Sequence, residues 1–162
     1  MSADTPSDSK QIFVSWLEIV GAVLRLHRLA ANRTQSDVAK AIGAAGHGSV
    51  ARFERGVSSP SLEQLPLICR CCGTTPSALM RDADAARLLL EEIGVQVVDT
   101  RREIEDLGRS GACSRSRSAL DLLKVVVDRK HGLDDYSRPL IERIRYSGRG
   151  LYLHDQRGDQ YW

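Results

Sequence analysis

The sequence predicts a mainly α-helical protein, with a helical domain in its N-terminal half and a smaller α+β unit after it. Two observations carry this prediction. Apolar residues recur at helical spacing through residues 12–80, and glycine or asparagine follows most of these runs. Beyond residue 81, a short alternating segment stands between helical patterns, as a strand would. We therefore expect a disordered polar tail over residues 1–11, a helical domain over 12–80 and a second unit over 81–162.

The charge distribution points weakly towards nucleic acid. Hydrophobic residues make up 42% of the chain and charged residues 27%, which is ordinary for a globular protein. Residues 12–80 carry seven Lys/Arg against four Asp/Glu, whereas residues 81–162 carry fifteen of each. The excess positive charge therefore lies on the N-terminal domain, as phosphate binding requires, although ordinary scatter of surface charge would also produce it.

Neither a secreted nor a membrane protein is indicated. Residues 1–10 are polar and acidic, and no apolar run approaches the ~18 residues of a membrane span. Cys69, Cys71 and Cys72 are helical neighbours that cannot bridge one another without strain. No second Cys/His pair stands at a metal-ligand spacing, so buried reduced thiols are favoured over a metal site. We expect a cytoplasmic protein with no metal and no cofactor.

The first helix is expected over residues 12–31, where apolar side chains fall on one face. Asn32 follows it and tolerates the left-handed conformation that ends a helix. The beginning of this segment is unusually apolar. The residues concerned are Ile12, Phe13, Val14 and Trp16. They either cover the core of their own domain or pack against the second unit or a partner chain. We favour packing against the second unit or a partner chain.

Two short helices joined by a tight turn come next. Thr34 is a good N-cap for the first, and Asp37 stands where a capping box has its acid. Gly43 ends this helix by supplying a left-handed conformation. After the turn, residues 47–55 restart the helical pattern until Gly56 stops it. The side chains expected to face the core are Val38, Ala39, Ile42, Val50 and Phe53.

Two further helices complete the N-terminal domain. Ser61 is expected to cap a helix that Pro66 must kink or restart, because proline lacks the N–H that a helix interior needs. Gly73 ends this helix, and residues 75–80 form a last short one. The residues expected on the buried face are Leu62, Leu65, Ile68, Cys69 and Cys72.

The second unit shows mixed patterns and no internal repeat. Its expected elements are helix over 84–93, strand over 95–98, helix over 100–107, a polar arginine-bearing loop over 108–118, helix or buried strand over 119–130, helix over 137–146 and a hairpin over 151–162.

The motif TQxxVAxAIG followed by SVxRFERGxxxPSLEQL resembles the helix-turn-helix domain of the XRE family, which is typified by lambda-type phage repressors and Cro. The resemblance covers about residues 18–80. It implies a five-helix lambda-repressor-like domain, with the helix over 47–55 as the recognition helix. The turn from Gly43 to Ser49 carries one residue more than the usual family spacing, which leaves open where the recognition helix begins.

The resemblance implies a DNA-binding surface on the recognition helix, which would enter the major groove. His47, Ser49 and Arg52 occupy positions that the family uses at base edges or nearby phosphates. Arg52 is the best candidate for guanine, because its guanidinium can bind O6 and N7 together. Gln35 matches a position that binds phosphate. Weaker phosphate candidates are Arg33, Thr34, Arg55, Ser58 and Ser59.

Arg28 and Glu54 match a family pair that joins the first helix to the recognition helix. A planar guanidinium can bind a carboxylate through two hydrogen bonds and tie two crossing helices together. We expect this ion pair to be structural rather than chemical, although two solvated charges remain the alternative.

The resemblance implies a sequence-specific transcriptional regulator, and we favour a repressor that binds an inverted-repeat operator in double-stranded DNA as a homodimer. Apolar runs over 88–93 and 120–126 could form the dimer, and ordinary core packing explains them equally well. The alternative function is an antitoxin-like or protein-interaction module, whose C-terminal half binds a partner protein while DNA binding serves autoregulation.

A sensor or an enzyme is less favoured. Arg115 and Arg117 could meet a small anionic ligand in the C-terminal half, or contact the DNA backbone. Serines upstream of Lys124 could suggest a catalytic Ser–Lys dyad. Such a dyad needs a specific geometry, and a serine-rich loop can place serines before a lysine by accident. We therefore expect no enzymatic activity.

Overall fold

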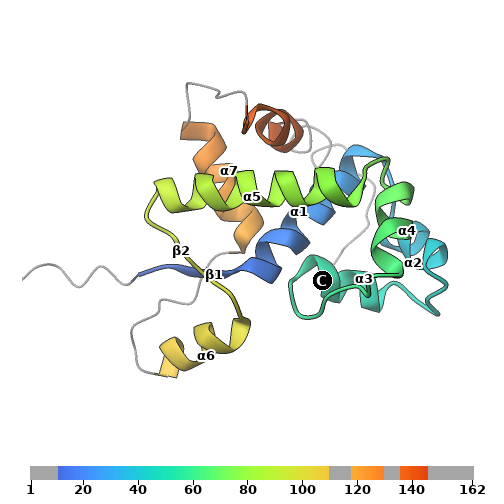
Figure 1. Cartoon of the computed structure of the whole chain (residues 1–162), viewed down its shortest axis with the longest axis horizontal. Coiled ribbons are helices and arrows are strands. Elements are labelled where there is room, and N and C mark those ends of the chain that lie inside the picture. Colours follow the sequence, from blue (N-terminus) through green and yellow to red (C-terminus); the bar gives the residue numbers. More distant parts are fainter. Residues whose placement is uncertain (1–10, 110–117, 130–135, 146–162) are drawn as a thin grey trace, which may run out of the picture.

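The computed structural model describes residues 11–109, 118–129 and 136–145 (Figure 1). Within these ranges the protein is mainly helical with a small parallel sheet, so the predicted fold class is confirmed. The elements are β1 (Phe13–Ser15), α1 (Trp16–Ala30), α2 (Gln35–Ala41), α3 (Gly48–Glu54), α4 (Gln64–Cys71), α5 (Pro76–Glu92), β2 (Gln96–Val98), α6 (Arg101–Arg109), α7 (Ala119–Arg129) and a helix over residues 138–145. The tail over 1–10, the arginines at 115 and 117, and the hairpin over 151–162 lie outside the described residues.

The prediction that the first helix starts at residue 12 was wrong, because the chain there forms β1. Helix α1 begins only at Trp16, with Ser15 as its N-cap. The Glu18 backbone N–H donates to Ser15 Oγ over 3.2 Å, and the Ser15 N–H donates to Glu18 Oε2 over 2.8 Å. This reciprocal pair is a capping box, which satisfies backbone donors that the first turn of a helix leaves without partners.

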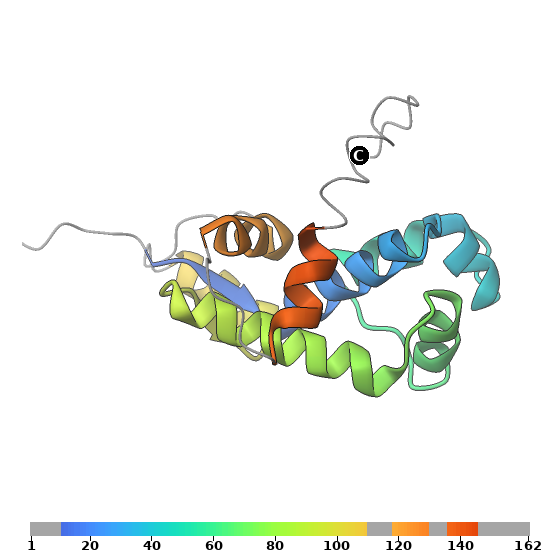
Figure 2. The same ribbon diagram turned by 90° about the horizontal axis from the view of Figure 1, so that it is seen from above.

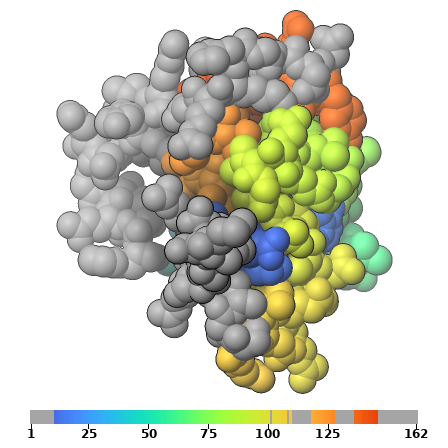
Figure 3. Space-filling model, turned by 90° about the vertical axis from the view of Figure 1, so that its left-hand side faces the viewer, coloured from blue at the N-terminus to red at the C-terminus, as the bar shows by residue number. Residues whose placement is uncertain are grey.

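Strand β1 pairs in parallel with β2, which follows the five N-terminal helices. Phe13 lies opposite Gln96, and Val14 lies opposite Val97. Parallel strands need a long crossover, and here helices α1 to α5 supply it. Phe13 and Val14 are buried, so the apolar start packs against the second unit. Figure 3 looks onto this end of the molecule, where α5 in green and α6 in yellow and orange flank a small blue surface of the first described residues.

Helix α5 is one continuous element where two separate helices were predicted. It runs from Pro76 to Glu92, with Thr75 as N-cap and proline in the first turn. Buried Leu79, Ala83, Ala86 and Leu90 continue one helical face without a break. The predicted boundary between residues 80 and 81 falls inside this helix.

Helix α4 begins later than expected. The Gln64 N–H donates to Ser61 Oγ, and the Ser61 N–H donates to Gln64 Oε1, each over 3.1 Å, but the helix itself starts at Gln64. Pro66 therefore lies in the first turn, where a backbone N–H has no intrahelical partner to lose. The expected burial of Leu62 was wrong. It precedes the helix and is 89% exposed.

A single buried apolar cluster joins the helices of both halves of the described chain. Helix α1 is central to it and contacts α3, α5 and α7. Figure 2 shows α7 in orange and the helix over 138–145 in red beside α5. Segment 119–129 is helical, which settles the choice between helix and strand. The buried members of the two predicted apolar runs are Leu89, Leu90, Leu120, Leu122, Leu123 and Val126.

Most apolar residues of these two runs therefore lie in the core, whereas Leu88 and Ile93 stay exposed at 39% and 43%.

None of the helices in the described part of the chain is both long and apolar enough to span a bilayer.

Candidate nucleic-acid interface

Helix α2 is capped as the sequence predicted. The Asp37 N–H donates to Thr34 Oγ1 over 3.1 Å, and the Thr34 N–H donates to Asp37 Oδ2 over 2.8 Å. Hydrogen bonds from the Thr34 backbone and hydroxyl lower the pKa of Asp37. The helix ends at Ala41 with Ile42 as its C-cap, and Gly43 follows with a φ of +68°, the left-handed conformation that glycine adopts without steric cost.

After the turn that follows, α3 begins at Gly48, one residue later than the predicted start at His47. His47 is the N-cap residue, but its side chain makes no capping hydrogen bond. His47 is exposed and Ser49 is half-buried. Ser49 Oγ donates a long hydrogen bond of 3.5 Å to the carbonyl of Gly46.

The two faces of α3 differ sharply. Val50, Phe53 and Glu54 are buried, and their spacing places them on one side of the helix. Arg52 and Arg55 are exposed on the opposite side. The buried side packs on the core, and the exposed side faces away from it.

Two glycines let α1 approach the C-terminal end of α3 closely. A Cβ at Gly21 would overlap the carbonyl oxygen of Phe53 and lie 2.8 Å from that of Glu54. A Cβ at Gly56 would lie 2.5 Å from Glu18 Cα, and the φ of Gly56 is +64°. Helix α3 therefore packs on α1 backbone to backbone. Sequence reasoning missed Gly21, although a glycine inside an apolar helix is itself a signal of close packing.

Arg28 and Glu54 form a two-point ion pair between α1 and α3. Arg28 Nε lies 2.5 Å from Glu54 Oε1, and Nη2 lies 3.1 Å from Oε2. Both residues are only 7% exposed. Arg28 Nη1 also donates to the carbonyl oxygen of Arg33 over 2.8 Å. The guanidinium thus fixes α1, the start of α2 and the end of α3 relative to one another.

Gln35 joins the same network. Its side-chain Nε2 donates to Glu54 Oε2 over 2.8 Å, and the residue is half-buried at the start of α2. The amide therefore faces inward, towards the ion pair. Its predicted phosphate contact stays a prediction and would use the second amide hydrogen or the backbone N–H.

The remaining candidate residues differ in whether their side chains are exposed and already hydrogen-bonded within the protein. Arg52 is exposed, and its guanidinium makes no hydrogen bond or ion pair with any residue that the structure describes. Arg55 Nε donates to the carbonyl of Ala51 over 3.2 Å and so folds back on α3. Ser58 is half-buried and Ser59 is exposed, beyond the end of α3. Arg52 is thus the arginine of α3 whose guanidinium stays free to bind a ligand within the described residues, and the side chains of Arg33, His47 and Ser59 are likewise exposed.

A second buried polar cluster lies behind α1 and escaped the sequence reasoning. His27 Nε2 and Asp82 Oδ2 are 2.9 Å apart in the core. Arg143 Nε approaches the same carboxylate oxygen at 3.7 Å, and Arg81 Nη2 lies 3.4 Å from Oδ1. Burial alone would raise the pKa of Asp82, but the hydrogen bond and charges around it produce a net lowering. No local motif announces this cluster, because its members come from distant segments.

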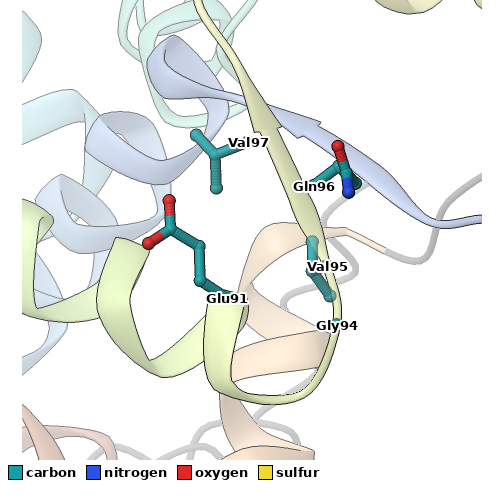
Figure 4. A pocket seen from close by; sticks show the side chains of 5 residues that line it. All are labelled: Glu91, Gly94, Val95, Gln96 and Val97. Carbon is teal, nitrogen blue, oxygen red and sulfur yellow. The ribbon is translucent and has the colours of Figure 1, made fainter.

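The C-terminal half offers a small hollow beside β2 (Figure 4). It has a volume of about 260 Å³ and is lined by Glu91 and residues 94–97. Ligand pockets for drug-sized molecules are usually ~300–1,000 Å³, so this hollow suits at most a small ligand.

The cysteines at the end of α4 and its C-cap pack in or against the core. Burial raises the pKa of Cys72 to about 12 and also raises that of Cys69. Thiols with raised pKa values are poor nucleophiles and poor metal ligands at neutral pH. Over the described ranges, no three His, Cys, Asp or Glu side chains gather as a metal site.

Comparison with known proteins assigns one part of the chain. Residues 19–82 match the model of a family described as a helix-turn-helix domain. The match starts inside α1 and ends inside α5, and the rest of the chain is not assigned. No curated protein matches the chain, and no solved structure matches it.

Proposed function

We propose that the chain is a sequence-specific transcriptional regulator. The premise is that residues 19–82 form a helix-turn-helix domain, which implies DNA binding. In this proposal the protein acts as a repressor and binds an inverted-repeat operator as a homodimer, with α3 in the major groove.

The observation that carries the proposal is the free Arg52 on a rigidly held helix. Arg52 is exposed and unpaired among the described residues, while α3 is fixed beneath it by the buried pair of Arg28 and Glu54. An arginine fork can bind O6 and N7 of one guanine, which discriminates against other bases by ~1–3 kcal/mol. Rigid positioning matters, because both hydrogen bonds require a narrow range of distances.

Phosphate contacts would surround this base contact. His47 and Ser49 flank the start of α3, and Ser58 and Ser59 follow its end, so these residues border the exposed face. The +3 net charge of residues 12–80 supports their approach to a polyanion. Gln35, Thr34 and Arg55 already make internal hydrogen bonds and would contribute weaker contacts.

The homodimer is supported by the small size of the reading surface. Helix α3 spans seven residues and can reach only a few base pairs, whereas a two-fold pair would double the site. The exposed Leu88 and Ile93 near the end of α5 are available apolar contacts for such a pair.

Selection of bound sequences from a random pool of double-stranded DNA would test the proposal with the full chain. We expect the wild type to enrich a palindromic motif and Arg52→Ala to lose specific binding far more than non-specific binding. Arg70→Ala is the matched control, because it removes an exposed arginine from α4 rather than from α3. Failure of the wild type to enrich any motif would contradict the proposal and direct attention to partner proteins.

A further inference from the structure

Two glycines, Gly46 in the turn before α3 and Gly48 at its first position, have no steric explanation within the described protein. Gly21 is required by crowding, and Gly43 and Gly56 are required by positive φ. Gly46 and Gly48 differ, because neither has a positive φ and a Cβ added at either would meet nothing within 4 Å. Glycine is a poor helix former, so alanine at position 48 would suit the isolated fold better.

Gly48 shares the exposed face of α3 with the residue proposed to read DNA. Residues 48, 52 and 55 fall at i, i+4 and i+7, which places them on one side of a helix. Gly48, Arg52 and Arg55 are exposed, and Ala51 between them is small. The helix therefore presents nearly bare backbone beside the free guanidinium of Arg52.

We propose that Gly48 sets the distance at which α3 approaches the duplex, so that Arg52 reaches the base edge. This inference rests on the proposed function and deepens it. Glycine allows a backbone to come close to a ligand, because no Cβ stands between them. A methyl group at position 48 would hold the helix back, and the two hydrogen bonds of Arg52 weaken steeply when their distances lengthen. Gly48 acts here as a positioning residue, and Arg52 makes the contact.

The test is a double-mutant cycle in the full chain, with the duplex selected by the wild type as the probe. We expect Gly48→Ala to weaken binding to this duplex at least ~10-fold, the loss that a displaced bidentate contact predicts. The same variant should keep its melting temperature or raise it by ~2 °C, because alanine favours the helix. In an Arg52→Ala background, Gly48→Ala should weaken binding by less than ~2-fold, because the contact it disturbs is already absent.

Gly46→Ala is the matched control. It makes the same chemical change in similarly open space, but in the turn before α3 rather than on the helix face. Its affinity should stay within ~2-fold of the wild type. Unchanged binding by Gly48→Ala, or equal losses from both glycine variants, would overturn the inference. Fully additive losses from Gly48→Ala and Arg52→Ala would also overturn it. A wild type that selects no duplex would instead contradict the proposed function.

Discussion

His27 and Asp82 lie 55 positions apart in the sequence, yet His27 Nε2 and Asp82 Oδ2 are 2.9 Å apart in the core. The contact joins α1 to α5, and Arg143 brings the helix over 138–145 to the same carboxylate. A buried charge with several partners is costly to strip of one of them, because the partners left behind remain desolvated. Removing one member of the cluster should therefore lower the free energy of unfolding.

Asp82→Ala should lower the free energy of unfolding by ~3–5 kcal/mol, because it leaves His27 buried without a partner for Nε2. Urea denaturation of the full chain would measure the loss. Glu91→Gln is the control, since Glu91 pairs with Arg87 at the surface and is 42% exposed. Such exposed pairs contribute at most ~1 kcal/mol. A similar small loss from Asp82→Ala would mean that the core contact does not stabilise the fold.

The same carboxylate should make stability depend on acid. The pKa of Asp82 is lowered in the folded protein from its ordinary value of 3.8. The folded state then favours the ionised form, so this contribution is fully present above 3.8 and is lost as the pH falls through the lowered folded value. Chemical denaturation of the wild type and Asp82→Asn over a pH series should give curves that converge in strong acid. A constant gap between the two curves at every pH would contradict this linkage.

Glu54→Ala should destabilise the protein by ~3–5 kcal/mol, because Arg28 would stay buried without its carboxylate and Gln35 would lose its acceptor. Thermal unfolding would detect the loss as a lower melting temperature. Glu63→Ala provides the comparison, since Glu63 is exposed before α4. An unchanged melting temperature for Glu54→Ala would show that the ion pair does not stabilise the fold.

Gly21→Ala should destabilise the fold by ~1–3 kcal/mol, the usual cost of overpacking, although alanine is the better helix former. The added methyl group would overlap the backbone oxygens of Phe53 and Glu54, which cannot swing aside as a flexible side chain can. Denaturant unfolding against Gly46→Ala, where space is open, would isolate the steric effect. Equal stability of the two variants would indicate that α1 and α3 can separate without cost.

Local signals predicted the helix-turn-helix well. Thr34 with Asp37, and glycine at positions 43 and 56, act through neighbours only three or four residues away, so the sequence displays them directly. The pairing of Arg28 with Glu54 was also expected, and the structure places the two side chains in contact. That expectation came from a resemblance that covers both residues, rather than from local pattern.

Contacts between distant segments could not be predicted in the same way. The short strand β1 reads as helix because its partner β2 lies far along the chain, and only the Ser-x-x-Glu pattern at Ser15 announces the later helix start. His27 and Asp82 belong to no motif, and their burial depends on how α5 crosses α1. The inward turn of Gln35 likewise depends on where α3 places Glu54.

The parallel pairing of β1 with β2 also sets an order of events during synthesis. Phe13 and Val14 leave the ribosome early, but their partners at positions 96 and 97 emerge only after all of α1 to α5. Until then the first strand has an unpaired, apolar edge, which is the kind of segment that aggregates or binds chaperones. Closing this sheet is a non-local and therefore slow step. Ser15 both ends β1 and caps α1, and its capping box with Glu18 is local, so the first helix can gain its N-terminus while the strand before it still waits for its partner.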